Sequence, residues 1–250
     1  MPDAPANCQC HGFGCRSRDL IEAHIVPKGF ARFIRQAHHN VILTKERTRR
    51  TPQLGVSDWN ILCSKCDGWL GRYDDALLNA AKNFRRLHHN AGLVWELPDV
   101  NPDEFAKGLF AILWRASLSQ RDHFAPFTLG RYQDIVRDII FGAKAFCESP
   151  ALSLLVQRYT SKRFDPSKFY TDPSLAPFMG LEAGGLGLAG FRFLAKFDDH
   201  PLDPGYANFD VTRCGIVRGL YMEVEKTPEF EHISQMVAAS IRRSDSRDHG

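Results

Sequence analysis

The sequence has no long hydrophobic run, no internal repeat and no large excess of charge of one sign. No stretch of about 18 apolar residues is present, so no membrane-spanning helix is predicted. The first ten residues lack the basic and then apolar pattern of a secretory signal peptide. Lys and Arg number 32, and Asp and Glu number 29, which gives a formal net charge of +3. We therefore expect a globular cytoplasmic protein of 250 residues with no membrane partner.

The seven cysteines are unevenly distributed, because five of them lie within the first 66 residues. An odd number in a cytoplasmic protein favours metal-binding thiols over disulfides. A C-x2-C pair begins at Cys63, and a longer pair that begins at Cys10 encloses two glycines. Because zinc prefers four soft ligands in a tetrahedron, the two pairs predict one structural Zn²⁺. The predicted ligands are Cys10, Cys15, Cys63 and Cys66. Cys8 and His11 are alternatives to Cys10, and the spacing leaves that choice open.

Hydrophobic periodicity predicts helices in the middle of the chain and strands towards its end. Apolar residues at spacings of three and four from Leu70 to Phe84 predict an amphipathic helix that ends near Asn90. A second helix is expected after a cap at Asn101 or Asp103. Further elements are predicted from composition and turn signals. The predicted helices beyond the first cover residues 101–120, 129–147 and 229–243, and the predicted strands cover residues 152–160, 190–198 and 214–226.

Two segments are interpreted as irregular. Residues 31–56 have no clear apolar period, and we interpret them as a mobile insertion. The series Gly185-x-Gly187-x-x-Gly190 matches a dinucleotide-binding pattern, but a strand rather than a helix is predicted after it. We therefore interpret these glycines as a flexible turn between strands.

The N-terminal motifs resemble the zinc-containing branch of the HNH nucleases, which are also called ββα-metal or treble-clef nucleases. The family pattern runs C-x-x-C, then H-I-x-P, then N-L-x-x-L-C-x-x-C-H. The matching segments here are Cys10-x4-Cys15, His24-Ile25-Val26-Pro27 and Asn60-Ile61-Leu62-Cys63-x2-Cys66-Asp67. The match covers about residues 8–80. It implies an α+β protein with a zinc-stapled, HNH-like treble clef at residues 1–90 and a helical and β-rich domain at residues 91–250.

The resemblance implies a metal-dependent endonuclease that hydrolyses phosphodiester bonds in DNA. His24 matches the family's general base, and Asn60 matches the Asn that steadies the loop carrying the base. An imidazole that titrates near neutrality can take a proton from water. The chain departs from the family at Ala23, where a metal ligand is usual, and at Asp67, which replaces the last His. Asp67 can still bind Mg²⁺ or Mn²⁺ through its carboxylate.

Basic residues are concentrated in the same N-terminal part. Up to residue 90 there are 14 Lys and Arg against 8 Asp and Glu, so that part carries about +6 and the remainder about −3. Such an asymmetry indicates a localised contact with a polyanion, since Lys and Arg bind nucleic-acid phosphates. The candidate nucleic-acid-binding residues are Lys28, Arg32, Arg35, Lys45, Arg47, Arg49 and Arg50. The alternative function is a catalytically inactive, zinc-scaffolded module that binds nucleic acid or protein, and a homodimer is also open.

Overall fold

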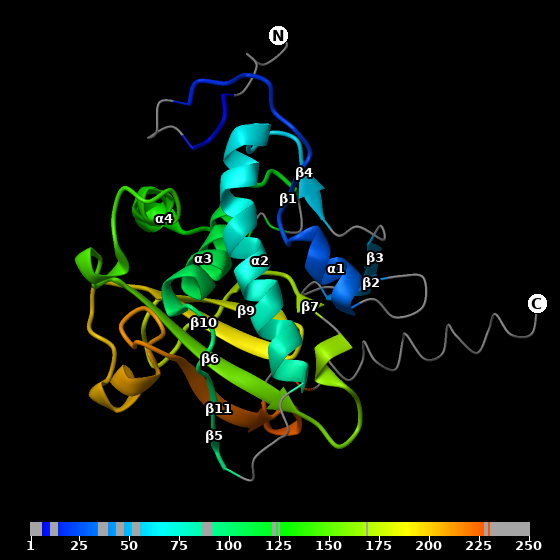
Figure 1. The fold of residues 1–250 in the computed structure, drawn as a ribbon, viewed down its shortest axis with the longest axis vertical. Coiled ribbons are helices and arrows are strands. Elements are labelled where there is room, and N and C mark those ends of the chain that lie inside the picture. The colour runs from blue at the N-terminus through cyan, green and yellow to red at the C-terminus, as the bar shows by residue number, and fades with distance from the viewer. Residues whose placement is uncertain are drawn as a thin grey trace, which may run out of the picture.

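The structure is a computed structural model of the chain. It describes residues 7–10, 15–34, 40–43, 48–51, 56–86, 92–121, 124, 126–168, 170–227 and 230. The protein is an α+β protein in which helices pack on a large mixed sheet. Figure 1 shows α2 and α3 lying across one face of this sheet. The four α-helices in the described ranges are α1 (Lys28–Ile34), α2 (Ser64–Arg86), α3 (Pro102–Leu118) and α4 (Gln133–Ile140).

The strands form one large sheet and one small ribbon. The large sheet has the order β3-β2-β7-β9-β10-β6-β11-β5, with β8 paired to β9. Its strands are β2 (Asn40–Leu43), β3 (Thr48–Thr51), β5 (Val94–Leu97), β6 (Leu152–Thr160), β7 (Tyr170–Thr171), β8 (Ser174–Leu175), β9 (Ala183–Leu188), β10 (Phe191–Phe197) and β11 (Val217–Glu223). The ribbon is the antiparallel pair β1 (Ala23–His24) and β4 (Ser57–Asp58).

The core lies between the helices and the large sheet, and aromatic rings fill it. Phe84 of α2 makes edge contacts with Trp95 of β5 at 5.1 Å and with Phe191 of β10 at 5.3 Å between ring centroids. Helices α2 and α3 approach closely at Gly108, where a Cβ atom would lie 2.6 Å from the carbonyl oxygen of Tyr73. The close crossing of the two helices therefore depends on glycine at position 108, which has no side chain.

A buried ion pair also joins the two long helices. The guanidinium of Arg115 on α3 donates from Nη1 and Nη2 to the Asp74 carboxylate on α2, at 3.0 and 2.7 Å. The Arg115 side chain is 1% exposed. A bidentate pair of this kind has a fixed geometry, so it sets the rotation of α2 against α3.

Most of the predicted regular elements are confirmed. Helix α2 begins at the cysteine pair, and α3 begins after Asn101, whose side chain accepts hydrogen bonds from the next turn. Strands β6, β10 and β11 lie within the ranges predicted for them. Helix α4 is shorter than the predicted residues 129–147, because a 3-10 turn precedes it and a loop follows Ile140. The predicted helix over residues 229–243 lies almost wholly outside the described residues.

One interpretation from the sequence is wrong, and a second is correct only for Gly190. The segment 31–56 contains the hairpin of β2 and β3, which joins the large sheet through β7. The glycines at 185 and 187 lie within β9, and the turn itself is formed by Ala189 and Gly190, which both have positive φ angles. The hydrogen bonds of the neighbouring strands, rather than an apolar pattern, fix both segments in the sheet.

The division into residues 1–90 and 91–250 stays a prediction, although one buried core cluster includes side chains from Cys8 to Val217. In the part of the chain that the structure describes, no helix combines the length and the apolar character needed to cross a membrane.

Candidate metal centre

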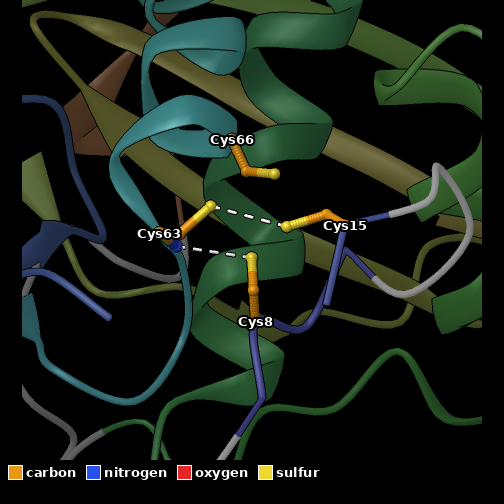
Figure 2. A group of neighbouring side chains, drawn as sticks. All are labelled: Cys8, Cys15, Cys63 and Cys66. Carbon is orange, nitrogen blue, oxygen red and sulfur yellow. Dashed lines mark hydrogen bonds between the residues drawn. The ribbon is translucent and has the colours of Figure 1, made fainter. Parts of the chain in front are cut away.

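Four cysteines come together where the N-terminal segment meets the start of α2. The sulfur atoms of Cys8, Cys15, Cys63 and Cys66 all lie within 4.8 Å of one another. Figure 2 shows the four side chains converging on a common point. Cys15 Sγ and Cys63 Sγ are 3.6 Å apart, close to the roughly 3.8 Å that Zn–S bonds of about 2.3 Å impose in a tetrahedron. The donor set and its spacing fit a structural Zn²⁺.

Backbone hydrogen bonds hold the two halves of this group together. The Gln9 N–H donates to the Ile61 carbonyl at 2.9 Å, and the Ile21 N–H donates to the Leu62 carbonyl at 2.9 Å. The Cys63 N–H donates to Cys8 Sγ at 3.3 Å, which is the lower dashed line in Figure 2. The residues around Cys8 are therefore fixed against the residues that lead into α2.

The structure groups Cys8, rather than the predicted Cys10, with the other three cysteines. Cys10 lies beside the group, with its sulfur 3.4 Å from Cys8 Sγ and 3.1 Å from Cys66 Sγ. His11, the other alternative from the sequence, lies outside the described residues. Cys15, Cys63 and Cys66 are members of the group as predicted.

Burial keeps part of this group protonated until a metal binds. It raises the pKa of Cys66, and it raises the pKa of Cys10 to about 12. Cys15 differs, because a hydrogen bond with the Ser17 backbone lowers its pKa to about 7. Zinc binds thiolates, so metal binding at neutral pH releases protons from the buried thiols. Metal affinity therefore falls as the pH is lowered.

His24 lies on the ribbon beside this centre. It pairs with Ser57 across β1 and β4, and the Ser57 hydroxyl donates to Glu22 Oε1 at 2.6 Å. Burial lowers the pKa of the half-buried His24 imidazole. The negative charges of Glu22 and Asp67 act in the opposite direction, and the positive charges of Lys28 and Arg115 add to the lowering. The imidazole is thus neutral at neutral pH, with two carboxylates in electrostatic range.

The other two predicted catalytic residues differ in their positions. Asp67 lies in the first turn of α2, where it is partly exposed and acts electrostatically on His24. Asn60 is exposed in the bend after β4, and its backbone N–H donates to Asp58 Oδ1 at 3.0 Å. The structure therefore brings Asp67 into electrostatic range of the histidine, and it holds Asn60 through a backbone hydrogen bond to Asp58.

Sequence reasoning missed Asp58, which is 4% exposed. Its carboxylate accepts hydrogen bonds from the Asn60 N–H, from the Ser119 hydroxyl at 2.7 Å and from the Gln120 N–H at 3.3 Å. Asp58 also pairs with Ala23 across the ribbon. It connects the strand opposite His24 to the end of α3. The sequence contains a signal for Asp58. In the family pattern N-L-x-x-L-C the Asn lies five residues before the Cys, and Asp58 lies five residues before Cys63.

Comparisons with known proteins add no relative. A scan against protein-family models gives no match, and searches of curated proteins and of solved structures give none either.

The predicted nucleic-acid-binding residues are only partly described. Lys28 is partly buried and Arg32 is exposed, both on α1. Arg49 and Arg50 lie on β3, the last strand at one edge of the large sheet. The remaining three, Arg35, Lys45 and Arg47, lie outside the described residues.

The residues around His24 offer few ligands for a catalytic ion. Among the described residues, the cysteine group is the one cluster of three or more His, Cys, Asp or Glu side chains that could hold a metal. Glu22 and Asp67 are the carboxylates near His24. Mg²⁺ commonly binds one or two protein carboxylates and takes its other ligands from water and substrate phosphates. Among the described residues near His24, the structure therefore shows no cluster of ligands for a catalytic ion.

Proposed function

We propose that the protein is a metal-dependent, HNH-like endonuclease that hydrolyses phosphodiester bonds in DNA. His24 is the general base, and a structural Zn²⁺ at the cysteine group stabilises the fold around it. The observation that carries the proposal is the position of His24. It lies on a two-stranded ribbon that precedes α2, and the carboxylate of Asp67 in the first turn of that helix is in electrostatic range.

The environment of His24 suits proton abstraction. Burial lowers the pKa of its imidazole, so the side chain is uncharged and can accept a proton from water at neutral pH. The negative charges of Glu22 and Asp67 stabilise the imidazolium that forms. The histidine is therefore poised to gain a proton without being charged beforehand.

Asp67, with Glu22, would hold a Mg²⁺ or Mn²⁺ ion. When bound, such an ion neutralises charge on the phosphate and on the leaving oxygen. Lys28 and Arg32 lie one helical turn apart on α1, which begins four residues after His24, and in this proposal they contact DNA phosphates. Arg35, Lys45, Arg47, Arg49 and Arg50 stay predicted contributors to the same contact.

The test is cleavage of plasmid DNA in Mg²⁺ or Mn²⁺ by the full chain and by matched variants. His24→Ala is compared with His200→Ala, because the His200 side chain is 82% exposed. We expect His24→Ala to lower the cleavage rate about 10² to 10⁴-fold and His200→Ala to leave it unchanged. Cleavage that survives His24→Ala would overturn the assignment of the base. Asp67→Ala should also lower the rate, whereas the exposed Asp99 gives a carboxylate control.

One observation favours the second candidate, an inactive zinc-scaffolded module that binds nucleic acid or protein. Ala23, which precedes His24 where the family usually has a metal ligand, is fully buried and has no donor atom. This candidate predicts a DNA mobility shift that Lys28→Ala and Arg32→Ala weaken, and no cleavage with either metal ion. A rate of cleavage that depends on His24 would exclude it.

A further inference from the structure

A fifth cysteine contacts the candidate zinc ligands. The Cys10 side chain is fully buried, and its sulfur lies 3.1 Å from Cys66 Sγ and 3.4 Å from Cys8 Sγ. Both distances are at or below a normal contact between sulfur atoms. A structural zinc accepts four ligands, so five sulfur atoms are present where four can bind at one time.

Cys8 and Cys10 both lie at the centre, although only Cys8 belongs to the group of four. They are separated by one residue, Gln9, whose N–H is held by the Ile61 carbonyl at 2.9 Å. Both side chains are fully buried. Because the backbone between them is anchored, an exchange of one sulfur for the other would need rotation of the two side chains. The Cys63 N–H donates to Cys8 Sγ, which favours Cys8 as the resident ligand.

We propose that Cys10 is a reserve zinc ligand that replaces Cys8 when Cys8 is lost or modified. The metal centre is then a five-thiol site that keeps a complete set of four thiolates after the loss of one of its two N-terminal sulfurs. The exchange is with Cys8 because Cys10 is two positions from it in the chain, whereas Cys15 is five positions from Cys10 and Cys63 belongs to the segment that leads into α2. This proposal does not depend on the proposed nuclease activity.

The test is the metal content and the ligand set of serine variants in the full chain. Cys8→Ser and Cys10→Ser should each bind about one zinc per chain, whereas Cys8→Ser/Cys10→Ser should lose its zinc to a chelator that the single variants resist. Substitution with Co²⁺ reports the ligands directly, because its d–d absorption bands distinguish four sulfur ligands from three. Cys8→Ser should keep the four-sulfur spectrum, and Cys15→Ser should lose it. The exposed Cys147→Ser is the matched control.

Two results would overturn the proposal. If Cys8→Ser loses zinc as easily as the double variant, Cys10 does not replace it. If Cys10→Ser alone loses zinc as easily as the double variant, Cys10 is an ordinary ligand. A measurement on the wild-type chain guards against misfolded variants. Zinc-loaded protein is treated with a limiting amount of an alkylating reagent, and native mass spectrometry follows the zinc in singly modified molecules. Molecules modified at Cys8 should retain zinc, and its loss from them contradicts the proposal.

Discussion

The buried carboxylate of Asp58 should contribute substantially to stability. Asp58→Ala removes the acceptor of three hydrogen bonds, from the Asn60 N–H at 3.0 Å, from the Ser119 hydroxyl at 2.7 Å and from the Gln120 N–H at 3.3 Å. A hydrogen bond to a charged group contributes about 1.5–3 kcal/mol. Asn60 and Gln120 are exposed, so water can replace the carboxylate there, whereas Ser119 is buried. We therefore expect a loss of about 3 kcal/mol, below the sum of the three bonds.

Thermal unfolding followed by circular dichroism measures this loss. For a chain of this size, about 3 kcal/mol corresponds to a fall in Tm of about 6–12 °C. Asp58→Asn should fall between wild type and Asp58→Ala, because the amide keeps one acceptor oxygen but cannot accept through its nitrogen. Asp99→Ala, at an exposed turn, should change Tm little. A Tm for Asp58→Ala equal to that of Asp99→Ala would refute the reasoning.

Three further predictions concern packing, charge and pH. Gly219→Ala should destabilise the protein by about 3 kcal/mol in urea, because its Cβ would lie 1.9 Å from the Val156 carbonyl oxygen; an unchanged midpoint argues against this strand contact. Arg115→Met should lower the free energy of unfolding by about 3–5 kcal/mol, because it leaves the Asp74 carboxylate buried without its partner. The double variant Arg115→Met/Asp74→Leu should recover most of this loss, and a double variant as unstable as Arg115→Met would show that the pair itself is strongly stabilising. Because burial lowers the pKa of His24, the unfolded chain binds its proton more tightly, and stability should fall as the pH drops below about 6.5. His24→Gln should reduce this fall in Tm between pH 7.5 and 5.5, and an equal fall in both proteins counts against it.

The long helices and the central strands could be predicted because their signals are local. In α2 the apolar residues repeat at helical spacing, and in α3 the Asn101 cap and Pro102 mark the first turn. Strand β6 begins with a mainly apolar segment, residues 152–156, and most of its residues are buried, which fits its central place between β10 and β11. Each of these elements shows its type within its own residues.

The remaining strands depend on partners far away in the chain. Strand β2 contains the short apolar run of residues 41–43, whereas β3 is polar, and the pairing with β2 gives β3 its place in the sheet. Strand β9 is rich in glycine because its neighbours come close: a Cβ at Gly185 would lie 2.9 Å from the Ala176 Cβ, and one at Gly187 would lie 3.2 Å from Thr171. Glycine there permits close packing, although from sequence alone it indicates a turn.

In the candidate site, too, contacts between residues that are distant in the sequence could not be predicted. The cysteine spacing predicts the metal centre, but Cys8 and Cys10 flank a single residue, and the Cys63 N–H that distinguishes them is distant in the sequence. The resemblance points to Asn60, the nearest residue of the expected type, and not to Asp58. The hydrogen bonds of Asp58 with Ser119 and Gln120 span about 60 positions and cannot be read from local sequence.

Zinc K-edge X-ray absorption spectroscopy of the purified full-length chain, combined with its metal content, tests the metal centre most directly. The structure predicts about one zinc per chain with four sulfur ligands at about 2.3 Å. Cys63→Ser/Cys66→Ser should lose the metal and the thermal stability that depends on it, whereas Cys147→Ser should keep both. A chain that is fully folded without metal, or a zinc bound mainly by nitrogen and oxygen, would contradict the account.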